Sequence, residues 1–130
     1  MLLNLSDLSA RPLQHQIFIQ VRALILSERL PPGTAIPSIR TLAREQQVSV
    51  ITIQRAYHDL QREGLIRSRR GKGFFVNELS KNQRCHMAEK RATEAISTII
   101  HEALAEGLHP GQIRSLVDRL LSWDSIASGK

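Results

Sequence analysis

The sequence predicts a mainly α-helical protein with one small β-hairpin. Five stretches space their apolar residues by three and four, as along one face of an α-helix. One short stretch instead joins two apolar runs through RRGKG, whose glycines favour a tight turn between strands. With 130 residues and one cysteine, the chain is long enough to bury a core without disulfide bonds.

The first helix is expected to begin near Pro12 and to end near Leu30. Its buried face is formed by Leu13, Ile17, Val21, Leu24 and Ile25. The prolines and glycine at 31–33 stop it, because proline cannot continue a helix. The following TAIP indicates a brief extended segment.

Two helices separated by a turn at 46–48 are expected next. Ser38 is suited to cap the first, whose buried residues are Ile39, Leu42 and Ala43. Arg40 and Arg44, four residues apart, share its exposed side.

The second of these helices is expected over residues 50–63, capped by Ser49 and ended by Gly64. Its inward face is Ile53, Ala56, Tyr57 and Leu60. Its opposite face is Val50, Ile51, Gln54, Arg55 and His58.

A hairpin follows, with Leu65 and Ile66 entering the first strand and residues 74–76 forming the second. Gly71 and Gly73 bracket the turn. Four of the six residues at 67–72 are cationic, namely Arg67, Arg69, Arg70 and Lys72.

Beyond a polar linker at 77–83, two amphipathic helices are expected, separated by Gly107, Pro110 and Gly111, with fraying after Trp123. Two helices alone bury too little area for an independent core, so we expect a second copy to cover them. The sequence therefore divides into an N-terminal domain at 1–78, which holds the first three helices and the hairpin, and a dimerisation region at 79–130. The expected dimerisation residues are Ala92, Ile96, Ile99, Ile100, Ala103, Ile113, Leu116, Val117 and Leu120.

Positive charge is concentrated in the N-terminal part. The formal net charge is +6 and the sequence pI about 10.4. Residues 1–80 hold eleven Lys and Arg against six Asp and Glu, whereas residues 81–130 hold seven against six. A localised basic surface favours a polyanionic partner.

A supporting helix, a tight turn, a second helix and a basic hairpin make up a winged helix-turn-helix, whose second helix enters the major groove of DNA. Residues 1–78 are therefore expected to form a winged helix-turn-helix DNA-binding domain. The hairpin cations are expected to meet phosphates or the minor groove. Arg44 has an alternative role, as the partner of an acidic neighbour. The expected DNA-binding residues are Arg40, Arg44, Ser49, Val50, Ile51, Thr52, Gln54, Arg55, His58, Arg69, Arg70, Gly71 and Lys72.

Val50 and Ile51 are unusual at the start of a solvated helix, because apolar side chains gain nothing from water. Two interpretations stay open. They contact thymine methyl groups in the groove, or they pack on the wing or the preceding turn.

The segments PSIRTLA, VSVITIQRAYHDLQREGLI and RRGKGFFV together resemble the N-terminal winged helix of the GntR family of bacterial transcription regulators, and the short C-terminal part resembles its YtrA subfamily. The resemblance implies a dimeric, repressor-like regulator on a palindromic operator, with the C-terminal helices dimerising. By motif position, Arg40 matches a DNA-contacting arginine, and Gln54 and Arg55 lie in the recognition helix. Arg70 and Gly71 match the wing tip. The family commonly has small polar or basic residues where this chain has Val50 and Ile51.

We therefore expect a sequence-specific transcriptional regulator in the cytoplasm, not an enzyme, without a cofactor or metal. The alternative is a winged-helix module that binds protein or RNA. Cys85, His86 and Glu89 lack the paired spacing of a zinc site, and no membrane-spanning stretch is present. The resemblance leaves room for a small-molecule effector, whose chemistry no residue pattern identifies.

Overall fold

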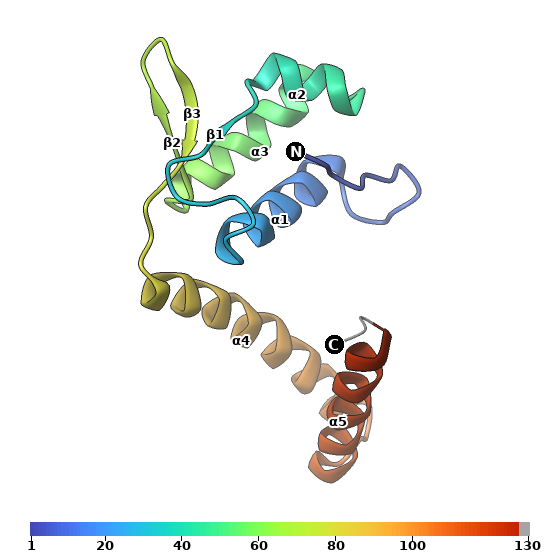
Figure 1. The fold of residues 1–130 in the computed structure, drawn as a ribbon. Coiled ribbons are helices and arrows are strands. Elements are labelled where there is room, and N and C mark those ends of the chain that lie inside the picture. The colour runs from blue at the N-terminus through green and yellow to red at the C-terminus, as the bar shows by residue number, and fades with distance from the viewer. Residues whose placement is uncertain (128–130) are drawn as a thin grey trace. The chain divides into compact units, whose positions relative to one another are not determined.

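The computed structural model describes residues 1–127, with side chains described as far as residue 123. Figure 1 shows a mainly helical fold with a small sheet, as expected. Contacts divide the chain into two compact units, residues 1–86 and the segment from Met87 onward. The domain boundary expected after residue 78 stays a prediction. The elements are α1 (Leu13–Leu26), β1 (Ala35–Ile36), α2 (Ile39–Gln46), α3 (Val50–Arg62), β2 (Ile66–Arg69), β3 (Gly73–Val76), α4 (Lys81–Ala105) and α5 (Pro110–Ala127).

The core of the first unit lies where α1 and α2 pack against α3. Its fully buried residues include the apolar faces that the helical spacing predicted, together with Leu65, Ile66 and Val76 of the hairpin. The prediction of these inward faces is confirmed by Ile17, Val21, Leu42, Ile53, Ala56, Tyr57 and Leu60, none more than 1% exposed.

The hairpin belongs to a three-stranded antiparallel sheet of order β1-β3-β2. Arg69 pairs with Gly73 at the turn end, and Ile66 pairs with Val76 at the other. The segment TAIP, expected only to be extended, supplies β1, with Ala35 opposite Phe75. This third strand depends on a pairing across 40 residues, which local sequence patterns do not reveal.

Helix α1 ends at Leu26, one turn before the expected end at Leu30. Glu28 takes a left-handed backbone conformation with φ of 62°, which an α-helix does not accommodate. The Leu30 N–H then bonds back to the Leu24 carbonyl at 2.9 Å and closes the helix end.

Helix α4 begins inside the expected linker, at Lys81. The Ser80 hydroxyl accepts from the Gln83 N–H at 3.1 Å, and the Gln83 amide oxygen accepts from the Ser80 N–H at 2.8 Å. This reciprocal capping box explains the early start. The first turn of α4 belongs to the first unit, where Arg84 bonds Glu28 at 3.1 Å.

In the second unit, the remainder of α4 and α5 follow each other through a turn in which Gly107 has φ of 99°. Pro110 opens α5 at a position where its missing N–H costs nothing. Helix α5 continues to Ala127, beyond the fraying expected after Trp123. None of the helices within residues 1–127 has the length and apolar character to span a membrane.

Candidate nucleic-acid interface

Helices α2 and α3 form a helix-turn-helix with matching caps. The Ser38 hydroxyl accepts from the Thr41 N–H at 3.1 Å, and the Ser49 hydroxyl accepts from the Thr52 N–H at the same distance. Both expected caps are therefore confirmed. Between the helices, Gln47 takes φ of 56°, and the Val48 N–H bonds the Ala43 carbonyl at 3.0 Å. This closed turn fixes the angle at which α3 is presented.

The outer face of α3 is open to solvent along its length. Ile51, Gln54, Arg55 and His58 follow the i, i+3, i+4, i+7 spacing and are all exposed. Val50 lies at the edge of this stripe and is 46% exposed. The core contacts of α3 are made by its opposite face, so this face is free to contact a partner.

The expected contacts Ser49 and Thr52 have a structural role at the start of α3. Their hydroxyl oxygens lie 2.8 Å apart, and Thr52 is half-buried. Both still lie at the helix end that in helix-turn-helix proteins faces the bases.

Tyr57 ties α3 to its surroundings and was expected only as a core residue. Its hydroxyl donates to the Pro37 carbonyl at 2.6 Å, and its ring meets Phe74 edge-on at 5.0 Å. Burial, together with the nearby Glu45 carboxylate, raises the pKa of Tyr57 above its usual range. One side chain thus connects the recognition helix with the segment before α2 and with strand β3.

The wing presents its cations at the turn between β2 and β3. Gly71 and Gly73 have φ of 74° and 93°, values that a side chain would strain, and the Lys72 N–H bonds the Arg69 carbonyl at 2.8 Å. Arg69 lies over the Phe75 ring at 5.3 Å, so it is held against the sheet. Arg70 and Lys72 are exposed at the tip.

Arg40 and Arg44 are exposed on α2. Among the described residues, ion pairs join Arg22 to Glu63, Arg62 to Asp59 and Arg84 to Glu28, and none includes Arg40 or Arg44. The alternative of an acidic partner for Arg44 therefore has no support in this part of the chain. Both guanidinium groups are available to a phosphate.

The N-terminal arm, residues 1–11, is held against α1 by side-chain amides and was not anticipated. The Gln20 amide exchanges two hydrogen bonds of 2.7 Å with the Asn4 backbone, and the Gln16 amide exchanges bonds of 2.9 and 2.8 Å with that of Ser6. Asn4 and Ser6 are two residues apart in the extended arm, about 6.6 Å, and Gln16 and Gln20 are four residues apart in the helix, about 6.0 Å. The two spacings therefore match. Beyond this contact lies a hollow of about 460 Å³, lined by Leu5, Asp7, Leu13, Gln46, Gln47, Val48, Ser49 and Thr52.

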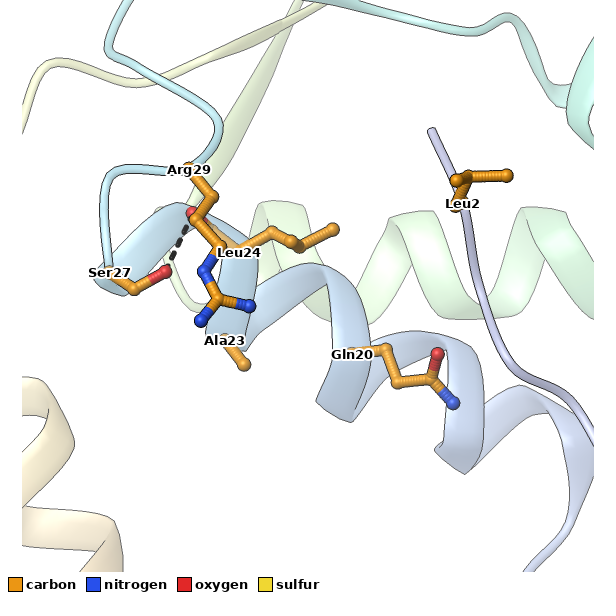
Figure 2. Close-up of a pocket in the computed structure, with 6 residues that line it drawn as sticks. All are labelled: Leu2, Gln20, Ala23, Leu24, Ser27 and Arg29. Atoms are coloured by element: carbon orange, nitrogen blue, oxygen red, sulfur yellow. Dashed lines mark hydrogen bonds between the residues drawn. The ribbon is translucent and has the colours of Figure 1, made fainter. Parts of the chain in front are cut away.

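A second hollow, of about 360 Å³, lies on the outer side of α1. Figure 2 shows Gln20, Ala23 and Leu24 along the helix, with Arg29 beyond its end and Leu2 opposite. The Ser27 hydroxyl, which also lines the hollow, donates a hydrogen bond to the Leu24 carbonyl at 3.4 Å. None of the lining residues comes from α2, α3 or the wing, so this hollow is separate from the candidate interface.

The described residues contain no group of three His, Cys, Asp or Glu side chains placed to hold a metal ion. Cys85 is exposed, as are His86 and Glu89.

The expected dimerisation residues lie on α4 and α5 of the second unit, largely uncovered. Ile96 and Ile99 are 54% and 62% exposed, and Leu120 is 52% exposed. Ile100 and Ile113 are half-buried around a hollow of about 180 Å³ that they line together. The remaining expected residues are Ala92, Leu116 and Val117, which are exposed, and Ala103, which is half-buried. Leu104, Leu121 and Trp123 are also exposed apolar residues of these helices and were not in the expected set.

Comparison with known proteins matches residues 13–76 to the family of bacterial regulatory proteins called gntR. The chain is 34% identical over 80 residues to the HTH-type transcriptional repressor YtrA of Bacillus subtilis, an alignment covering 62% of each protein. It is 37% identical over 70 residues to the uncharacterized HTH-type regulator YhcF of the same organism, over 54% of this chain and 58% of YhcF. The chain thus spans about 60% of the length of these relatives.

Solved structures give the same result over more of the chain. A GntR family transcriptional regulator from Listeria monocytogenes superposes with a TM-score of 0.75 at 26% identity, covering 88% of this chain and 98% of that protein. YtrA from Sulfolobus acidocaldarius, a GntR-family transcription factor, gives a TM-score of 0.56 at 28% identity, covering 92% and 96%. The similarity to both YtrA proteins supports the YtrA-like subfamily. The matched winged helix, its motifs and these relatives establish that the chain belongs to the GntR family of bacterial regulatory proteins.

Proposed function

We propose that this protein is a transcriptional repressor that binds a palindromic DNA operator as a homodimer. The observation that carries the proposal is the outer face of α3. It combines hydrogen-bonding side chains suited to base edges, in Gln54, Arg55 and His58, with solvent exposure and freedom from core contacts. The family and the repressor YtrA support the same assignment.

The cations around this face supply the non-specific part of the binding. Arg40 and Arg44 on α2, and Arg70 and Lys72 on the wing, are exposed within the same unit. Contacts from these residues to phosphate release condensed counterions, so affinity falls steeply with salt concentration. They hold the protein on the duplex, while the α3 side chains select the sequence.

The homodimer is supported by the uncovered apolar residues of α4 and α5. Single exposed apolar residues are ordinary, but a set that follows helical spacing along two helices marks an interaction surface. A two-fold dimer would offer two recognition helices to successive major grooves, with half-sites about 34 Å apart centre to centre. The cytoplasm, where bacterial DNA lies, is the corresponding location.

Selection of bound duplexes from a random DNA pool tests this proposal. We expect an enriched sequence with two inverted half-sites separated by about one helical turn. Binding of the selected duplex and of a scrambled duplex is then compared at moderate salt. A preference of less than tenfold would contradict operator binding and favour a module for protein or RNA.

A further inference from the structure

The start of the recognition helix, α3, carries an apolar side chain at a position where DNA-binding helices usually carry a polar one. Ile51 is 58% exposed and lies one turn before Gln54 and Arg55 on the same stripe of α3. With more than half of its surface uncovered, burial in the core does not explain its type. The interpretation that it packs on the wing or the preceding turn therefore has no support, since most of its surface is uncovered.

The neighbourhood of Ile51 indicates which kind of partner covers it. Arg55 lies four residues on along the same face, Arg40 and Arg44 are exposed on the preceding helix, and Arg70 and Lys72 are exposed on the wing of the same unit. A protein partner with an apolar contact would have to accommodate these cations, whereas a DNA duplex neutralises them with phosphates.

Within a major groove, the chemistry of the Ile51 side chain selects one group. Isoleucine neither donates nor accepts hydrogen bonds, and covering a base donor or acceptor with it leaves that group unpaired. The 5-methyl of thymine is the apolar group that the base edges present there. Residues at the N-terminal end of a recognition helix are those that reach base edges.

We propose that Ile51 is a specificity-determining residue that contacts a thymine methyl group in each half-site. This inference rests on the proposed function and specifies the base that one position of α3 reads. Val50 has a different place: it lies at the edge of the stripe, between the exposed face and the buried Ile53 and Tyr57, and is less exposed. We therefore assign the methyl contact to Ile51 and use Val50, which stays an expected DNA contact, only as a control for the discrimination between thymine and uracil.

The test uses the full-length protein and the selected duplex, with uracil replacing thymine at one position at a time. Uracil removes only the methyl group. At one thymine per half-site, we expect affinity to fall about fourfold, the equivalent of one buried methyl group, and about fifteenfold when both half-sites are changed. Uracil at the other thymines outside the α3 contact should have little effect.

Variants then assign the effect to a side chain. I51S removes the apolar branches at an exposed position, so the fold is retained, as a melting curve checks. We expect I51S to bind the thymine duplex about as weakly as the wild type binds the uracil duplex, with no further loss on uracil DNA. V50S makes the same kind of change at the neighbouring apolar residue and is expected to keep the discrimination between thymine and uracil, whatever its effect on overall affinity.

Each contrary result has a distinct meaning. If every uracil replacement is neutral in the wild type, or if the selected half-site contains no thymine, the inference is wrong while operator binding stands. If I51S still discriminates thymine from uracil, another residue reads the methyl group and the assignment is wrong. If no sequence is selected at all, the proposed function fails, and the inference fails with it.

Discussion

Removing the Tyr57 hydroxyl by Y57F is expected to weaken the anchorage of the recognition helix. The hydroxyl donates the 2.6 Å hydrogen bond to the Pro37 carbonyl, and Tyr57 is 1% exposed. Phenylalanine keeps the ring, its burial and its edge-on contact with Phe74. The variant therefore isolates a single hydrogen bond.

The size of the effect follows from the surroundings of that bond. An intramolecular hydrogen bond contributes about 0.5–1.5 kcal/mol to the free energy of unfolding, and an orphaned buried carbonyl costs more. Residue Pro37 is half-buried, so water can partly replace the lost donor. We expect Y57F to lower the free energy of unfolding by about 1 kcal/mol, or the melting temperature by about 4–8 °C for a unit of this size.

The pH dependence of the same variant provides a second measurement. The pKa of Tyr57 is raised in the folded state by burial and by Glu45, relative to about 10 in the unfolded chain. Both states hold the proton below pH 10, so this group adds no pH dependence there. Above pH 10 the unfolded chain loses the proton first, and the wild-type free energy of unfolding falls by up to about 1.4 kcal/mol per pH unit. Y57F lacks this loss, so the stabilities of the two proteins should meet near pH 11.

The measurement is urea unfolding followed by circular dichroism at pH 7 and at several values between pH 9 and 11. F74L is the control, because it removes the ring contact but keeps the hydroxyl and its titration. A Y57F stability within about 0.3 kcal/mol of wild type at pH 7 would refute the anchoring role of the hydrogen bond, given the usual value of at least 0.5 kcal/mol. A constant difference across the alkaline range would refute the raised pKa.

Further predictions concern DNA binding and assembly. R70A should weaken binding to all duplexes about equally, and it should reduce the slope of log affinity against log salt by about one unit per half-site. Q54A should instead relax the choice of base at one base pair. A sequence-selective loss of affinity in R70A would show that the wing reads bases. L116D places a charge on the proposed dimer surface and should give a monomer in sedimentation experiments, with L8D, which changes another exposed leucine, as the control. A dimeric L116D would mean that another surface joins the copies.

Local sequence signals were sufficient for most of the DNA-binding unit. Ser38 and Ser49 marked helix starts because a hydroxyl at that position bonds the backbone three residues on, as both do. Gly71 and Gly73 marked the wing turn because left-handed backbone favours glycine. The inward residues of α3 followed from spacing alone.

Features that depend on distant partners were not predictable in this way. Strand β1 pairs with β3 some 40 residues on, and the amides of Gln16 and Gln20 hold an arm with no pattern of its own. The hydroxyl bond from Tyr57 to Pro37 likewise crosses between elements. The start of α4 was placed too late although its signal is local. Ser80 and Gln83 form a capping box that can be read from the sequence, and it places the start of α4 at Lys81.

The candidate site depends both on local sequence signals and on contacts between residues distant in the sequence. Spacing predicted that Ile51 lies on the outer face of α3, but not whether the wing or the preceding turn covers it. The structure leaves it 58% exposed, which gives no support to packing on the wing or the preceding turn. The absence of an ion pair at Arg44 among the described residues narrows its role in the same way.

The central claim, that two copies of this chain occupy one symmetric operator, is tested most directly by titrating the selected duplex with the protein. The mass of the complex gives its stoichiometry, and a duplex with one half-site scrambled shows whether both are needed. We expect two chains per intact duplex and a loss of at least tenfold in affinity, about 1.4 kcal/mol, when one half-site is scrambled. One chain per duplex, bound equally well with either half-site scrambled, would contradict the claim.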